Sequence, residues 1–548
     1  MCHPAPMAIV PESRARRIAL AVAFQGVLAI ITTWPLATRW RTHLPLGAES
    51  VPTVPQFNLW TLQWNAARIP DLFRGYWDAP IFAPTAGAFA RSEAQPLTGL
   101  LFTVVRPFTG EVGGYNLVLL TMLTLNGLVL ALLARRLGAD YPAALLAGAL
   151  GQTLPFVSNE LGVLQLVPLF PFWLLLERLV AYRQRPNWVR LADAGAALGA
   201  LALVSGYYAL FTGLVLVVIG PPLVIGARPW RQLARDVAIA GAIAGAIALP
   251  FSLAQQRHTA GSSWSYETVE ANSARGTDLV RHDDGTVGVP WAFERDGGQA
   301  LFPGGVALLL AGIGIAGATR TQRRFVVGAI VAAALLAIVA LGLRLHVAGH
   351  VPYAFVRDHV PGFDRLRSPF RAAVMTQALL AALGALGLAW LWRRPAGRVL
   401  AVAFVVASVI ETVHWDQPTS RVPDVAGFDW VQWLDDAPSG VVAMVPFPAT
   451  GNVGDYDDTT VAMLAGLEHG HPLVNGYTGL FPESYRSLRS EMAWFPDAAT
   501  VAILDEFDVT YVVIRHDWER ATTAAVTLPA LGYERVFAGA TRDVWRRR

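Results

Sequence analysis

The chain has 548 residues, of which 54% are hydrophobic and only 15% are charged, and its mean hydropathy is +0.42. This composition excludes an ordinary soluble enzyme and indicates a protein whose main solvent is lipid. The formal net charge is +3, but the arginines gather in connections between apolar segments and in the tail Arg546–Arg548. We therefore attribute them to membrane orientation and expect no nucleic-acid partner.

A single cysteine, Cys2, excludes an intrachain disulfide and any chemistry that needs several thiols. The apolar run that follows the N-terminal arginines ends in Trp34-Pro35 without a clear cleavage site. We interpret it as a first, uncleaved membrane span.

About eleven apolar segments are long enough, or nearly so, to cross a bilayer. Arginine clusters such as Arg135/Arg136 lie at alternate connections, as the positive-inside rule requires of cytoplasmic loops. The clusters predict a cytoplasmic N-terminus, and the odd number of spans then predicts an extracytoplasmic C-terminus. We expect the membrane to be a bacterial inner (plasma) membrane. The segments are Ile18–Ala37, Val112–Leu133, Pro142–Val157, Gln165–Ala181, Ala192–Val204, Tyr207–Ile225, Val237–Leu253, Leu301–Ala318, Phe325–Leu343, Ala372–Trp392 and Val399–Val413.

Residues 1–413 thus form a helical polytopic membrane domain with three long outer loops, 38–96, 254–300 and 344–371. In the first loop, Phe57, Trp60 and Trp64 are interleaved with polar residues, which predicts a helix lying flat at the membrane interface. The apolar stretch Pro96–Pro107 is too short to span and is expected to be re-entrant or interfacial. The second loop, with Asp283, Asp284, Glu294 and Asp296 among its acids, is expected to be solvated and partly mobile.

After Val413 the composition changes to that of a polar C-terminal domain, residues 414–548. Strands are predicted at Val441–Phe447 and Val509–Ile514, a hairpin at Val536–Trp545, and helices near Thr459–Leu467, Glu483–Trp494 and Ala498–Phe507. This pattern predicts a small extracytoplasmic α/β domain. Its aromatic residues could stack on sugar rings, although most such residues are core: Trp430, Trp433, Tyr456, Tyr477, Tyr485 and Trp494.

Carboxylates beside the outer membrane surface are candidate general bases, because partial desolvation raises a carboxyl pKa toward the working pH. Glu49 follows the first span by about a dozen residues and is the first candidate; a solvated loop acid is the plainer alternative. Asp78 and Glu93 are the other candidates, and Asp78 is also typical of a turn.

Arginines in the third outer loop, 344–371, require an explanation, because the positive-inside rule predicts few arginines in outer loops. Arg365, Arg367 and Arg371 are candidates for binding a leaving phosphate, with headgroup anchoring or pairing to nearby aspartates as the equal alternative. Glu160 and Gln165, at the outer turn between the third and fourth spans, are further candidates for substrate binding.

The pair His469 and His471 is weak evidence for a metal, and an ordinary surface turn is the preferred interpretation, so we expect no metal site there. The residues leave open whether a divalent cation participates elsewhere.

Several segments resemble the GT-C superfamily of membrane glycosyltransferases, in particular its bacterial polytopic members and, loosely, the YfhO-like branch. They are Val54–Asn65, Tyr76–Pro84, Ser92–Thr98, Tyr115–Leu117, Ser205–Tyr208 and Pro361–Pro369. The resemblance implies a GT-C fold, a polyprenyl-phosphate-linked sugar donor, and an acidic base in the first outer loop, where Glu49 matches best.

The implied reaction is inverting transfer of a hexosyl or pentosyl group to a hydroxyl of a glycan, lipid or protein acceptor at the outer face. Two other functions remain open: a flippase or transporter of a lipid-linked glycan, and a non-catalytic assembly subunit of envelope glycan synthesis. Few charges lie at span centres, which favours chemistry at the outer surface over transport.

Overall fold

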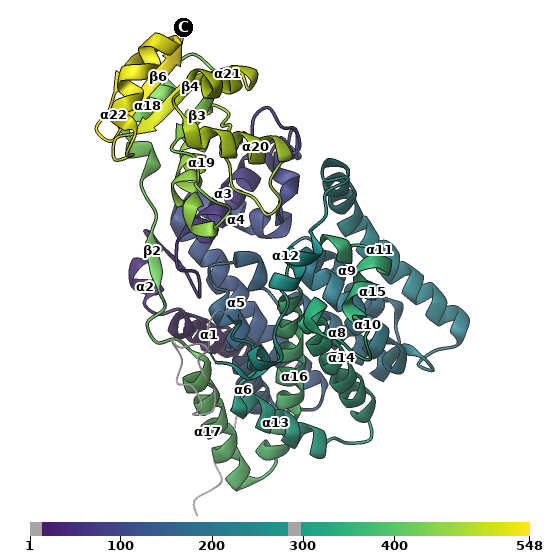
Figure 1. Ribbon diagram of the computed structural model, residues 1–548. Helices are drawn as coiled ribbons and strands as arrows, with labels where there is room; N and C mark the ends of the chain where they lie inside the picture. Colours follow the sequence, from purple (N-terminus) through teal and green to yellow (C-terminus); the bar gives the residue numbers. More distant parts are fainter. Residues whose placement is uncertain (1–13, 283–297) are drawn as a thin grey trace, which may run out of the picture.

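The computed structural model describes residues 14–282 and 298–548. A bundle of helices forms the larger part, and a smaller α/β domain containing the C-terminus stands at one end of it (Figure 1). Cys2 and the second-loop acids Asp283, Asp284, Glu294 and Asp296 lie outside the described residues.

Each of the eleven predicted spans falls on a helix. Within the described ranges, eight apolar segments are long enough to cross a membrane, so the chain is a multi-pass membrane protein. They are built on α1 (Arg14–Thr32), α5 (Glu111–Arg136), α8 (Phe170–Gln184), α10 (Gly206–Val224), α11 (Trp230–His258), α14 (Arg323–Leu341), α16 (Ala373–Trp392) and α17 (Pro395–Thr412). The other three predicted spans coincide with shorter helices, α6 (Tyr141–Gln152), α9 (Trp188–Ala202) and α13 (Gly305–Ala316).

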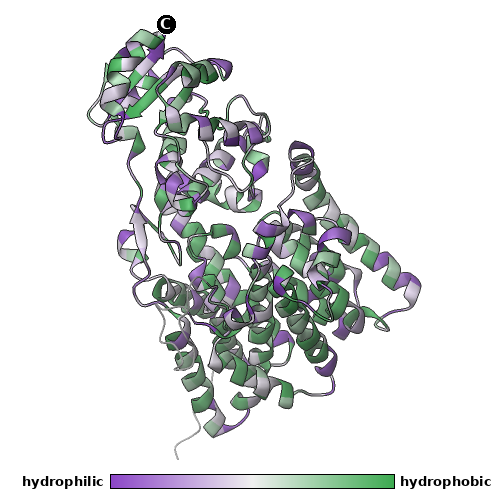
Figure 2. Ribbon diagram, in the orientation of Figure 1, coloured by the Kyte–Doolittle hydropathy of each residue, from purple (hydrophilic) through white to green (hydrophobic). Residues whose placement is uncertain are grey.

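Glycines bring α13 and α16 into backbone contact. A Cβ at Gly314 would lie 2.1 Å from the carbonyl oxygen of Leu383, and one at Gly387 would lie 2.2 Å from that of Leu310. In a membrane, small residues allow such close approach, and dispersion then stabilises the pair. Figure 2 shows the hydrophobic residues concentrated on the helices of the membrane domain, with hydrophilic residues mainly at the helix ends and in the C-terminal domain.

The first outer loop contains α2 (Leu36–Arg39), β1 (His43–Pro45), α3 (Thr53–Arg68), a 3₁₀ turn at Ala88–Arg91 and α4 (Pro96–Thr109). The predicted helix around Trp60 is present, but its interfacial position is wrong, because Phe57, Trp60 and Trp64 are buried. The ring of Phe57 meets the edge of Tyr477 at 5.3 Å, so the C-terminal domain, rather than lipid, covers the helix.

Helix α4 has an apolar face that the described chain leaves exposed. Leu100, Val104 and Phe108 recur at four-residue spacing on it and are 46%, 62% and 82% exposed. This face suits the interfacial position predicted for Pro96–Pro107.

The predicted α/β character of the C-terminal domain is confirmed. Its four-stranded sheet has the order β3 (Val441–Val445), β4 (Val509–Arg515), β6 (Arg542–Arg547), β5 (Tyr533–Ala538). The β3–β4 pair is parallel and the other two pairs are antiparallel. The helices are α18 (Asp429–Asp435), α19 (Asp457–His469), α20 (Glu483–Glu491), α21 (Ala498–Glu506) and α22 (Ala521–Thr527).

Two sets of backbone hydrogen bonds tie this domain to the first outer loop. Strand β1 pairs antiparallel with β2 (Thr419–Arg421), which follows α17. Farther along, the amide of Leu473 donates to the carbonyl of Pro80 at 3.0 Å and the amide of Ala83 to that of Leu473 at 2.9 Å. The C-terminal domain therefore forms one wall of the space above the membrane helices.

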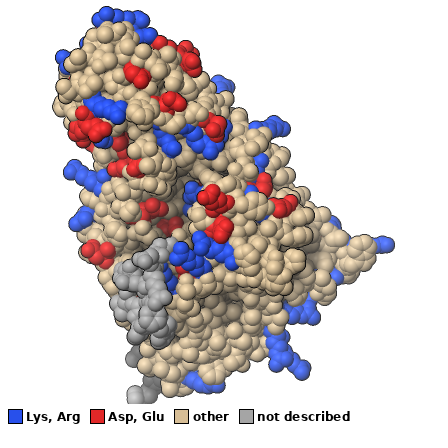
Figure 3. Space-filling model, in the orientation of Figure 1, with Lys and Arg blue, Asp and Glu red and all other residues tan. Residues whose placement is uncertain are grey.

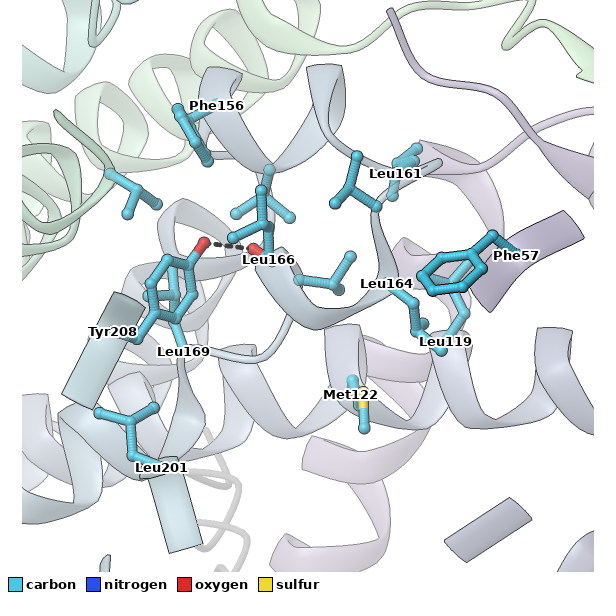
Figure 4. Close-up of a cluster of buried hydrophobic side chains, with 14 of the residues drawn as sticks. Phe57, Leu119, Met122, Phe156, Leu161, Leu164, Leu166, Leu169, Leu201 and Tyr208 are labelled. Atoms are coloured by element: carbon cyan, nitrogen blue, oxygen red, sulfur yellow. Dashed lines mark hydrogen bonds between the residues drawn. The ribbon is translucent and has the colours of Figure 1, made fainter. Parts of the chain in front are cut away.

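Between α6 and α8, within the membrane domain, the chain breaks into short helical turns joined by irregular backbone. It forms α7 (Pro155–Asn159) and a 3₁₀ turn at Leu164–Leu166, and Figure 4 shows its Phe156, Leu161, Leu164 and Leu166 among buried side chains. Non-helical backbone at this depth needs internal hydrogen-bond partners. Asn126 supplies them, because its Oδ1 accepts from the amides of Leu169 and Phe170, both at 2.8 Å.

Candidate functional site

Two acids and two arginines from distant parts of the sequence meet where the domains face each other. The carboxyl groups of Glu49 and Glu160 interact electrostatically with each other and with the guanidinium groups of Arg367 and Arg371. Figure 3 shows acidic and basic side chains gathered on the walls of a hollow between the two domains. We call these four residues the charged cluster.

Glu49 is held by the turn that follows β1. The amide of Leu46 donates to the carbonyl of Pro418 at 2.8 Å, and that of Ala48 donates to the carbonyl of Asn159 at 2.7 Å. Gly47 has φ +60°, and a Cβ there would lie 2.3 Å from the same Asn159 oxygen, so glycine is required for this approach. These contacts hold the turn that carries Glu49 directly against the turn that carries Glu160.

Glu160 follows directly on α7. Burial raises its pKa to about 7; Arg371 and Arg367 oppose this shift and Glu49 adds to it. Burial also raises the pKa of Glu49, again against the two arginines. Both carboxyl groups therefore bind a proton more readily than a solvated glutamate does.

Aromatic faces position the two arginines. The guanidinium carbon of Arg371 lies 4.8 Å from the ring centroid of Tyr207, and that of Arg367 lies 5.3 Å from the ring centroid of Trp264. The backbone amide of Arg367 also donates to the Tyr207 hydroxyl at 3.1 Å. The Nε of Arg371 is buried and has no hydrogen-bond partner among the described residues, so this donor is available to an anion.

Glu93 reaches the other side of Arg371 and caps α10. Its Oε1 accepts from the amide of Gly206 at 2.7 Å and from the Ser205 hydroxyl at 3.3 Å. Burial raises its pKa, whereas Arg371 and these hydrogen bonds lower it. The Oε1 of Glu93 thus fixes the Ser205–Tyr208 segment, on which Tyr207 supports Arg371, whereas its Oε2 is buried without a hydrogen-bond partner among the described residues.

The remaining sequence candidates have other partners. The Oδ1 of Asp78 accepts from the amide of Gly87 at 2.8 Å, which matches the turn alternative. Gln165 accepts from Gln95 at 3.3 Å in a row of amide side chains. Arg365 donates to the hydroxyl of Thr259 at 2.6 Å.

The C-terminal domain contributes Tyr477 to the same space. This residue is half-buried, and Arg367, Glu49 and Arg371 are among its electrostatic neighbours. By contrast, Trp430 and Tyr485 are core residues, each 1% exposed.

The roles of Tyr207 and Trp264 were not predicted from the sequence. A single aromatic residue gives no signal that it stacks on an arginine before the fold is known.

The two histidines considered as metal ligands are part of the domain core, so a surface turn is the wrong description. Each is 4% exposed, and burial lowers the pKa of His469 to about 4. The Nε2 of His471 contacts the carbonyl oxygen of Leu434 at 2.8 Å. Within residues 14–282 and 298–548 no group of three His, Cys, Asp or Glu side chains is arranged to hold a metal ion.

One family model, described as a domain of unknown function (DUF6311), matches residues 79–409, which is more than half of the chain. The chain belongs to the DUF6311 family. The matched range includes Glu93, Glu160 and both arginines of the charged cluster; Glu49 and the C-terminal domain lie outside it. No curated protein matches the sequence.

Solved structures show which fold the DUF6311 chain has. The oligosaccharyltransferase of Archaeoglobus fulgidus, in its apo form, matches with a TM-score of 0.53 at 13% identity, over 91% of this chain and 69% of that one. ArnT from Cupriavidus metallidurans matches with TM-scores of 0.45 in the apo state and 0.43 bound to undecaprenyl phosphate. The identities are 14% and 16%, over 97% of this chain and 98% of ArnT. The GT-C fold predicted from the sequence is confirmed.

Proposed function

We propose that this protein is a membrane glycosyltransferase that moves a sugar from a polyprenyl-phosphate donor to an acceptor hydroxyl at the outer face. The observation that carries the proposal is the charged cluster, which places two desolvated carboxyl groups beside two arginines at the mouth of a GT-C fold. The donor class is the one that the resemblance to GT-C glycosyltransferases implies.

Each member of the cluster has a chemical role in this reaction. Glu49, whose pKa is raised by burial, takes the proton of the acceptor hydroxyl. The acceptor oxygen then bonds to the anomeric carbon from the face opposite the leaving group, while the bond between that carbon and the phosphate oxygen breaks. The products are an inverted glycoside and a polyprenyl phosphate.

The arginines stabilise the charge that develops on the leaving phosphate. Arginine stays charged when partly dehydrated, and its planar fork of donors matches phosphate oxygens. The Nε of Arg371 is buried without a hydrogen-bond partner among the described residues, and it can donate to a phosphate oxygen. Both guanidinium groups are held by stacking on aromatic rings.

The test is a pair of matched variants, Glu49→Gln and Asp78→Asn, assayed in proteoliposomes with radiolabelled polyprenyl-phosphate sugars. General-base catalysis is worth about 10²–10⁴ in rate, so Glu49→Gln should lower transfer by that factor without changing thermal unfolding. Asp78→Asn should keep most of the activity, because Asp78 accepts a turn hydrogen bond from Gly87. Full transfer by Glu49→Gln together with loss in Asp78→Asn would overturn the assignment of the base.

A further inference from the structure

A cavity of about 170 Å³ adjoins the charged cluster on the side of Glu160. Its walls include Ala48, Phe156, Asn159, Glu160, Leu301 and Phe370. Ala48 and Phe370 directly precede Glu49 and Arg371 in the sequence, and the lining residue Glu160 interacts electrostatically with both, so the cavity adjoins the charged cluster.

The walls of this cavity are fixed by hydrogen bonds. The amide of Phe156 donates to Oε1 of Gln377 at 3.0 Å, and Nε2 of Gln377 donates to the carbonyl of Leu301 at 3.1 Å. The amide of Leu301 donates in turn to the carbonyl of Asp278 at 3.0 Å. One glutamine of α16 thus joins two walls of the cavity and fixes their separation.

The side chain of Asn159, in the cavity wall, has an unsatisfied hydrogen-bond acceptor. Asn159 is only 9% exposed, and its Oδ1 is buried without a hydrogen-bond partner among the described residues, while its Nδ2 donates to the carbonyl of Ala300 at 3.5 Å. A buried acceptor without a donor is costly, so this oxygen indicates a ligand that supplies one.

The mixed lining defines the chemistry of that ligand. Asn159, Glu160, Arg281 and His282 present polar groups to the cavity. Phe156, Phe370 and Leu301 present apolar surface, and the two phenylalanine rings are 6.3 Å apart. A sugar ring has hydroxyl groups on its edge and C–H groups on its faces, and so satisfies both kinds of wall. A serine or threonine side chain has one hydroxyl and leaves most of the cavity empty.

We propose that this cavity binds the acceptor, and that the acceptor presents a sugar ring whose hydroxyl groups bind Asn159 and Glu160. The inference rests on the proposed glycosyl transfer and names its acceptor class. The protein then extends a glycan or glycolipid rather than modifying a peptide or an amine.

The test uses Asn159→Leu, which keeps the branched shape of the side chain and removes both of its polar atoms. Asn452→Leu, at an exposed asparagine of the C-terminal domain, is the control. Proteoliposomes containing labelled donor are offered butyl β-glucoside, a threonine-containing hexapeptide or hexylamine. The wild type and the control should transfer to the glucoside in preference. Asn159→Leu should raise the KM for the glucoside about tenfold or more and leave the KM for the donor unchanged.

Preference for the peptide or the amine would overturn the inference, and so would an unchanged KM for the glucoside in Asn159→Leu. If the wild type transfers sugar to none of the acceptors, the proposed function fails, and binding of tritiated butyl glucoside to the purified protein then decides about the cavity alone. Binding that Asn159→Leu abolishes supports the cavity; equal binding by both proteins contradicts it.

Discussion

Individual residues of the candidate site could be identified from the sequence, because the arginines among them depart from the positive-inside rule. Arg367 and Arg371 fall in a connection for which the positive-inside rule predicts few arginines, and Glu49 follows the first predicted span. What the sequence could not reveal is the pairing of Glu49 with Glu160, because the hydrogen bond from Ala48 to Asn159 that brings the two turns together joins residues more than a hundred positions apart. The same holds for Tyr207 beneath Arg371.

The raised pKa of Glu160 predicts how donor binding depends on pH. Below about pH 7 Glu160 is protonated and neutral; above it, the group ionises and adds a negative charge beside Arg371 and Arg367. That charge weakens the attraction of the arginines for the donor phosphodiester, which stays monoanionic throughout this range. The KM for the donor should therefore rise roughly tenfold between pH 6 and 8.5.

Glu160→Gln has no proton to lose, so its KM for the donor should stay flat over the same range. Steady-state kinetics with varied donor lipid at five pH values measures both proteins. An identical rise of KM in the variant would show that another group is responsible.

At the scale of elements, hydropathy located a helix at each of the eleven predicted segments, eight of them long enough to cross a membrane within the described residues, and the main strands of the C-terminal domain. Burial in lipid and burial in a sheet both leave continuous apolar runs. It misplaced α3, because an aromatic helix face packs equally well on headgroups and on another domain, and only the position of Tyr477 distinguishes the two. The short helices α6, α9 and α13 also fall below the usual spanning length. For α13, contact with α16 at Gly314 explains how so short a helix is held.

This contact predicts that Gly314→Ala destabilises the membrane domain. The added methyl group would lie 2.1 Å from the carbonyl oxygen of Leu383, so α13 and α16 must move apart, at a cost of about 1–3 kcal/mol. Gly312→Ala, two residues earlier in the same helix, is the matched control, because a Cβ there meets nothing within 4 Å. Thermal unfolding in detergent should show a lower midpoint for Gly314→Ala alone, and equal midpoints would contradict the close packing.

At the scale of the whole molecule, the site exists only because the first outer loop and the C-terminal domain lie on the same side of the membrane. The β1–β2 pair and the bonds between residues 80–83 and Leu473 require this arrangement. The sequence predicted the shared compartment from the alternation of arginine clusters, but not the hydrogen bonds, which depend on the register of two short extended segments far apart in the chain.

Cysteine labelling tests this topology, since Cys2 is the only native cysteine and can be replaced by serine. In that background, Ala86→Cys in the first outer loop and Asn452→Cys in the C-terminal domain should react with a membrane-impermeant maleimide in intact cells. Thr319→Cys, in the connection between α13 and α14, should react only after the cells are opened. The reverse pattern for any of the three positions would contradict the orientation.

The central claim, sugar transfer at the outer face, is tested most directly by incubating oriented membrane vesicles with a polyprenyl-phosphate sugar labelled in the sugar. The labelled sugar should move to an acceptor, and unlabelled polyprenyl phosphate should accumulate in proportion. If the labelled lipid instead only changes leaflet with its sugar still attached, or stays unchanged, the protein is a lipid flippase or an assembly subunit and the claim is contradicted.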